Sequence, residues 1–174
     1  MRRILNIKKL QIMRKIIFSI IFIASIVFSA SAQKINQVPP VPTYNLPNGW
    51  HKFIDQGATF DVEVLESKLT QGNIIWLDQS KYSGSLFGHT ITGKGTYTWP
   101  DKKRYEGGFK KNNRHGWGVM YYLDGTKYSG KWKNNKKQGK GKFYDKDGKV
   151  VQQGVWENDI YVGAKKKKKK KKKS

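Results

Sequence analysis

The sequence has no cysteine and only three histidines, His51, His89 and His115. Without cysteine, neither disulfide bonds nor thiolate metal sites can hold the chain together, so its fold depends on packing. One histidine precedes the repeated part of the chain, and we expect the other two in loops between strands. Histidines scattered in this way do not converge on a catalytic triad or a metal site. We therefore expect a protein that is not an enzyme and that binds no cofactor and no metal.

The first 32 residues have no acidic side chain. Six basic residues precede the apolar run Ile16–Phe28, and the small residues Ala30, Ser31 and Ala32 follow it. This order is typical of a secretory signal peptide that is cleaved after Ala32. An uncleaved membrane anchor is the alternative, although the run is short for a bilayer span. We predict that residues 1–32 are a signal peptide and that the protein is exported, to the periplasm or the exterior, with a peripheral position on a membrane as one option.

The chain ends in nine consecutive lysines, Lys165–Lys173, before Ser174. Residues 164–174 are predicted to be a solvated, disordered tail, which either binds anionic surfaces or is a low-complexity run without function. Without these nine lysines and the six basic residues at the start, 20 Lys and Arg face 12 Asp and Glu, a net charge of +8. Residues 33–49 hold four of the five prolines, which predicts an extended linker.

A pattern of about 23 residues repeats through the second half of the chain. We divide it into repeats 82–104, 105–127 and 128–151 and a truncated repeat 152–163, after an N-terminal cap, 50–81, that contains a degenerate repeat, 59–81. The first, third and fifth positions of the units carry tyrosine, glycine and a large apolar residue: Tyr82, Gly84, Leu86; Tyr105, Gly107, Phe109; Tyr128, Gly130, Trp132; and, with Gln152 first, Gly154, Trp156. Two more glycines follow in each complete unit: Gly93 and Gly95, Gly116 and Gly118, Gly139 and Gly141.

A spacing of two residues places side chains on one face of a β-strand. Tyr128, Gly130 and Trp132 should therefore share a face. We predict that "NNKKQ", from Asn134, is a loop and that "DKDG", from Asp145, turns the chain, so that each unit is a β-hairpin. The aspartates at positions 101, 124 and 147 then initiate turns. Because glycine weakens a strand, we predict that the glycines leave room for aromatic rings from the neighbouring strand.

The stretch "YSGKWKNNKKQGKGKFYDKDG", from Tyr128, resembles a MORN (membrane occupation and recognition nexus) repeat, and the chain as a whole resembles a secreted bacterial protein of this family. Residues 82–163 follow the pattern, with Leu86 and Phe109 in place of Trp, Lys102 in place of a turn Gly and Gln152 in place of Tyr. The resemblance implies an all-β fold, an elongated single-layer antiparallel sheet of stacked β-hairpins whose motif aromatics line a groove. It also implies membrane attachment or protein assembly.

The motif aromatics invite a sugar-binding or lipid-binding interpretation, but packing explains them first. The opposite face is expected to be basic, with Lys94, Lys110, Lys131, Lys133, Lys140 and Lys142, and the predicted loops add Lys111, Arg114, Lys136 and Lys137. Charged faces are ordinary for a solvated sheet, yet charge of one sign favours an anionic partner. We predict a binding or scaffold protein that docks on an anionic phospholipid or polysaccharide surface or on an acidic protein. The alternative is a subunit that assists or targets a separate enzyme. Nucleic acid is not expected as a partner of an exported protein, and the oligomeric state stays open.

Overall fold

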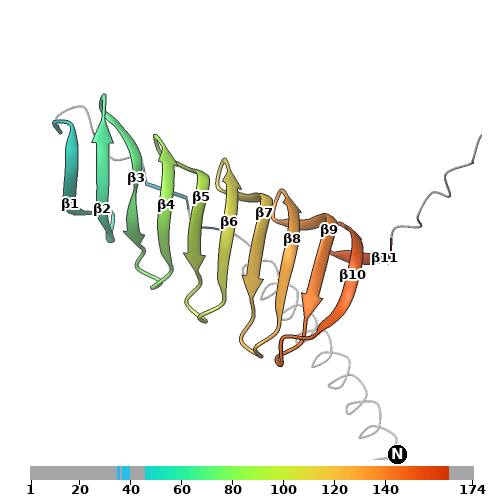
Figure 1. Cartoon of the computed structure of the whole chain (residues 1–174). Helices are drawn as coiled ribbons and strands as arrows, with labels where there is room; N and C mark the ends of the chain where they lie inside the picture. The colour runs from blue at the N-terminus through green and yellow to red at the C-terminus, as the bar shows by residue number, and fades with distance from the viewer. Residues whose placement is uncertain (1–34, 36, 40–45, 165–174) are drawn as a thin grey trace, which may run out of the picture. The chain divides into compact units, whose positions relative to one another are not determined.

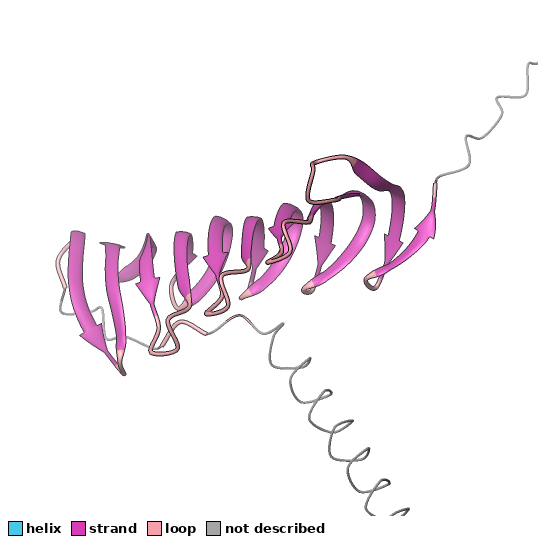
Figure 2. Ribbon diagram, turned by 90° about the horizontal axis from the view of Figure 1, so that it is seen from below, coloured by secondary structure: helices cyan, strands magenta, loops and turns pink. Residues whose placement is uncertain are grey.

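The structure, a computed structural model, describes residues 35, 37–39 and 46–164, which lie within one compact unit, residues 35–174. The predicted signal peptide, 1–32, and the lysine run, 165–173, lie outside the described residues. The described residues form a single antiparallel sheet of eleven strands, in which each strand pairs with the next one along the chain (Figure 1). Figure 2 shows that the strands form one layer. The predicted fold class is confirmed.

The strands are β1 Gly49–Asp55, β2 Ala58–Leu65, β3 Lys68–Ile75, β4 Lys81–Phe87, β5 Thr90–Thr98, β6 Arg104–Lys110, β7 Asn113–Tyr121, β8 Lys127–Lys133, β9 Lys136–Tyr144, β10 Val150–Glu157 and β11 Ile160–Gly163. Each repeat contributes two of them, joined by a tight turn. No helix among the described residues is long and apolar enough to cross a membrane.

The turns inside the repeats have only two residues, and both have positive φ angles in every unit except the first, where only Gly88 does. Asn134 and Asn135, for example, have φ angles of 50° and 68°. Such turns match the twist of the strands they join, and asparagine tolerates this conformation. Strand β9 therefore starts at Lys136, directly after the two asparagines, and the predicted five-residue loop is wrong. For the same reason His115 lies within strand β7 and not in a loop.

The connections between repeats are turns in which an aspartate carboxylate accepts a backbone hydrogen bond, as predicted for two of the three positions. Oδ1 of Asp101 and of Asp124 accepts a hydrogen bond from the backbone N–H two residues further on, at 3.0 and 2.9 Å. In the third repeat the accepting aspartate is Asp145, two positions earlier in the unit, whose Oδ1 accepts a bond of 3.0 Å from the N–H of Asp147. The prediction was therefore wrong for Asp147, whose carboxylate lies exposed beside Lys146.

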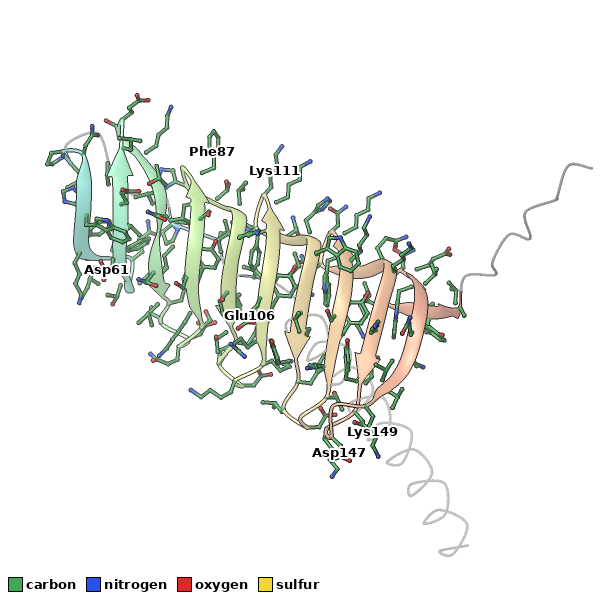
Figure 3. The ribbon with its side chains drawn as sticks, viewed as in Figure 1. Asp61, Phe87, Glu106, Lys111, Asp147 and Lys149 are labelled. Carbon is green, nitrogen blue, oxygen red and sulfur yellow. The ribbon has the colours of Figure 1, made fainter. Side chains whose placement is uncertain are left out.

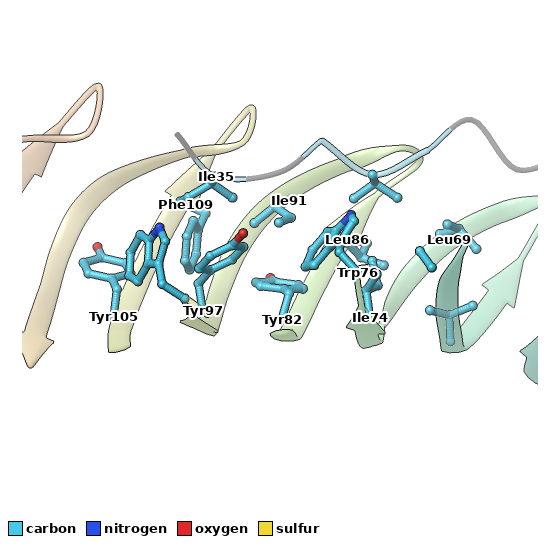
Figure 4. Close-up of a cluster of buried hydrophobic side chains, with 14 of the residues drawn as sticks. Ile35, Leu69, Ile74, Trp76, Tyr82, Leu86, Ile91, Tyr97, Tyr105 and Phe109 are labelled. Atoms are coloured by element: carbon cyan, nitrogen blue, oxygen red, sulfur yellow. The ribbon is translucent and has the colours of Figure 1, made fainter. Parts of the chain in front are cut away.

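One face of the sheet, here called the aromatic face, carries the buried hydrophobic core, and Figure 4 shows the part of it between Leu69 and Phe109. The first tyrosine of each complete repeat is at most 1% exposed, and its ring lies over glycine backbone. A Cβ atom placed on Gly95 would come within 2.5 Å of the hydroxyl oxygen of Tyr82. That hydroxyl donates a hydrogen bond of 2.6 Å to the carbonyl oxygen of Ser85, three residues along the same strand. The prediction that glycines make room for rings is confirmed for this second glycine of the Gly-x-Gly pair.

The first glycine of each pair has a different reason to be there. Gly93, Gly116 and Gly139 have φ angles of 94°, 77° and 85°, which most side chains rarely adopt. At Gly116 an added Cβ would meet no atom within 4 Å, so no ring requires the space. These glycines lie where the register of the hairpin shifts, since three residues of β7, His115, Gly116 and Trp117, oppose one residue of β6, Gly108. The single explanation drawn from the sequence was therefore wrong for these positions.

Part of the predicted linker packs against the sheet. Ile35 and Val38 are 1% and 4% exposed and belong to the same core as the repeat tyrosines. Figure 4 shows Ile35 above Ile91 and Phe109. The backbone carbonyl of Gln37 accepts a hydrogen bond of 3.1 Å from Nε1 of Trp76. This segment therefore covers part of the aromatic face, while the boundaries of the linker and the other predicted domains stay predictions.

Candidate functional site: a basic outer face around Trp117

The candidate site lies on the outer face, defined as the face of the sheet opposite the aromatic face. Its centre is Trp117 of β7, which is 58% exposed although it lies in the middle of a strand. Trp117 pairs with Lys131 of β8, and Nζ of Lys131 lies 6.0 Å from the centroid of the indole ring. This distance is at the limit of a cation–π contact, so the two side chains present one apolar plane and one charge side by side.

Two shallow hollows share Trp117 as a wall. One, of about 540 Å³, lies between Trp117, Lys140, Lys142 and Tyr144. The other, of about 550 Å³, lies toward β5, where Lys94 borders it. Both hollows have glycine backbone in their lining: Gly141 and Gly154 in the first, Gly95, Gly107, Gly108 and Gly116 in the second.

The six predicted lysines are all exposed, but they do not form one group. Lys94, Lys131, Lys140 and Lys142 lie around Trp117, and we call these four the central lysines. Lys110 and Lys133 end their strands beside the tight turns, the edge where Figure 3 labels Lys111. Lys133 borders a separate hollow of about 390 Å³.

The central lysines have no acidic partner within the part of the chain that the structure describes. The ion pairs found there join Lys103 to Asp101, Arg104 to Glu106 and Lys146 to Asp147. Glu106, which Figure 3 labels in the middle of β6, also accepts a hydrogen bond of 3.2 Å from the hydroxyl of Tyr121. Burial, with a contribution from this carboxylate, raises the pKa of Tyr121. Glu106 is thus already paired with Arg104 and Tyr121, so it does not compensate the positive charge around Trp117.

The repeat aromatics form the core, in agreement with the packing interpretation. Tyr105 meets Trp132 of the next repeat edge to face, with ring centroids 5.4 Å apart, and Tyr128 meets Trp156 at 5.1 Å. Such pairs are worth about 0.5–1.5 kcal/mol beyond their buried area. Burial raises the pKa of Tyr105 and Tyr128 well above the ordinary value. These rings therefore join neighbouring repeats and present no open platform for a sugar or a lipid chain.

Two cations that the sequence analysis placed in loops lie on the aromatic face. Arg114 is 4% exposed, and its Cζ lies 4.6 Å from the centroid of the Trp132 ring. Burial lowers its pKa to about 10. Lys137 lies 4.7 Å from the centroid of the Trp156 ring, and burial lowers its pKa as well. The signal that could have revealed them is Ile91, the apolar residue at the same position of the first repeat.

The fold and this site define a repeat protein built from β-hairpins, with a structural face and an exposed basic face. Comparison with protein-family models identifies the repeats: the MORN repeat matches residues 82–104, 105–127 and 128–150. The chain therefore contains three consecutive MORN repeats, in the register that the sequence predicts. A search of curated proteins finds no significant match. MORN repeats are binding and scaffold modules of a non-catalytic kind.

Proposed function

We propose that this protein docks on an anionic membrane surface through the outer face around Trp117. The observation that carries the proposal is the exposed indole surrounded by four lysines that have no acidic partner among the described residues. Tryptophan favours the level of the lipid head groups, and lysines are attracted to anionic lipids. Export, which we predict from residues 1–32, would bring this face to the outside of a cell membrane.

The expected strength follows from the number of lysines. Each lysine near an anionic membrane contributes about 1 kcal/mol at most, and the attraction fades within a Debye length. The four central lysines together contribute up to about 4 kcal/mol. Binding should therefore weaken steeply as salt is added, and it should require anionic lipid.

The test compares binding to vesicles of phosphatidylcholine alone and of phosphatidylcholine with phosphatidylglycerol. A version of the protein that ends at Ala164 prevents the nine terminal lysines from masking the effect. Changing the four central lysines to Gln should weaken binding to the anionic vesicles at least tenfold. The control changes four other exposed lysines to Gln, with the same loss of charge, and should have a much smaller effect: Lys52, Lys68, Lys102 and Lys149.

A second pair of variants separates the indole from the charges. Trp117→Ala should weaken binding, whereas Trp50→Ala, which removes an equally exposed indole from β1, should not. Equal binding to neutral and anionic vesicles would refute the proposal, as would equal losses in the two lysine variants. Binding to an acidic protein or polysaccharide in the absence of vesicle binding would replace the membrane as the partner.

A further inference from the structure

The aromatic face contains polar groups that its packing does not satisfy. Three buried N–H groups have no hydrogen-bond partner among the described residues: Nε1 of Trp99, Nε of Arg114 and Nε1 of Trp156. Most buried donors in folded proteins have a partner, so each exception calls for an explanation. Cζ of Arg114 lies 5.5 Å from the ring centroid of Trp99, so two of the three groups are neighbours.

Arg114 also carries a charge that no ion pair among the described residues neutralises; the carboxylate of Asp159 acts on it electrostatically without forming one, while burial lowers its pKa. Its Nη2 donates a hydrogen bond of 2.7 Å to the carbonyl oxygen of Asn135, and its guanidinium lies over aromatic rings. No carboxylate of the described part of the chain forms an ion pair with it. A buried cation is normally paired with an anion, because burial without a pair is costly. The arrangement therefore suits a ligand that brings an oxygen acceptor and a negative charge.

The chain's own N-terminal segment shows how such a ligand can bind. Residues 35 and 37–39 lie on the aromatic face, with Ile35 and Val38 buried and the Gln37 carbonyl bonded to Nε1 of Trp76. Trp99 stands 23 residues after Trp76, which is one repeat. Both tryptophans open the same kind of turn, since the N–H of each bonds to the carbonyl four residues on, at 3.0 and 2.9 Å. Trp99 therefore presents, one repeat later, the same indole N–H donor that Trp76 uses to bond a backbone carbonyl.

We propose that the aromatic face binds an extended acidic peptide from another molecule, whose backbone carbonyl accepts from Nε1 of Trp99 and whose carboxylate accepts from Nε of Arg114. The N-terminal segment cannot supply this carboxylate, because the chain has no Asp or Glu before Asp55. The positive character of the face continues in the next repeat, where Nζ of Lys137 lies within 6 Å of four aromatic ring centroids. This surface is distinct from the outer face proposed to meet the membrane.

The test uses the full-length protein and two short capped peptides. One has the sequence Pro-Glu-Pro-Pro-Glu-Pro, and the other has Gln in place of both Glu residues. The prolines hold each peptide in an extended polyproline II helix with side chains repeating every third residue, the spacing of Ile35 and Val38. Binding is followed by calorimetry and by the indole N–H resonance of Trp99 in ¹H–¹⁵N spectra.

We expect the Glu peptide to bind at least tenfold more tightly than the Gln peptide and to shift the Trp99 resonance. Arg114→Gln should remove the preference for Glu, while Lys110→Gln, an equal loss of charge at an exposed outer position, should preserve it. Trp99→Phe keeps the buried ring and removes the donor, so it should weaken both peptides severalfold. If Arg114→Gln does not fold, the Trp99→Phe variant tests the proposal in its place. Equal affinity for the two peptides, no binding of either, or an unmoved Trp99 resonance would overturn the proposal.

Discussion

Replacement by Ala and replacement by Asn should rank in opposite order of stability loss at the two glycines of one Gly-x-Gly pair, Gly116 and Gly118. Gly116 has a φ angle of 77° and free space around its missing Cβ, whereas a Cβ on Gly118 would lie 2.5 Å from Cε2 of Tyr105. The first position is limited by backbone conformation and the second by volume. Asparagine tolerates the left-handed conformation better than alanine does, but it is larger.

The expected magnitudes follow from these two causes. Gly116→Ala should lower the free energy of unfolding by about 1–2 kcal/mol, the cost of the left-handed conformation for a residue with a Cβ. Gly116→Asn should cost less. Gly118→Ala should cost about 1–3 kcal/mol through overpacking against the ring, and Gly118→Asn more than that.

Urea unfolding of the four variants and the parent protein, followed by tryptophan fluorescence, measures these differences. The order of Ala and Asn should invert between the two positions. If Asn is the more harmful substitution at both glycines, or Ala at both, then one cause governs the pair and our distinction between them is mistaken. A change in the urea dependence of any variant would show that the denatured state or the two-state behaviour has changed as well.

Three further results are expected. Lys102 has a φ angle of 72°, and Gly125 occupies the same turn position of the next repeat. Lys102→Gly should therefore raise the free energy of unfolding, and Gly125→Lys should lower it, by about 1 kcal/mol each. Urea midpoints that stay the same in both variants would contradict the strain argument. Burial raises the pKa of Tyr105 in the folded state, so the unfolded chain loses this proton first and stability should fall as the pH rises above about 10; Tyr105→Phe should reduce the slope, and an unchanged slope would refute this cause. Ile35→Ala should destabilise by about 2 kcal/mol or more, whereas Ile54→Ala, at a side chain that is 75% exposed, should stay within about 0.5 kcal/mol in the same unfolding assay; equal effects would mean that the N-terminal segment does not pack as described.

The sequence by itself determined the fold class and the register of the repeats. Tyrosine, glycine and an apolar residue at alternate positions can bury one face of a strand only, and this constraint sufficed to predict the hairpins and their order. The same alternation placed Lys131 and Lys133 on the exposed face, where the structure has them. Local patterns succeed here because each repeat contacts mainly its neighbours along the chain.

The tertiary structure alone decided what lies on the aromatic face besides the motif residues. Because each tight turn has only two residues, the strand resumes early enough to carry Arg114 and Lys137 onto that face, where side chains of the preceding and following strands surround them. The position of Ile35 depends on contacts with residues more than 50 positions away in the chain, and no local pattern encodes such contacts. The grouping of four lysines around Trp117 likewise results from pairing between strands, since their spacing in the sequence does not distinguish them from Lys110 and Lys133.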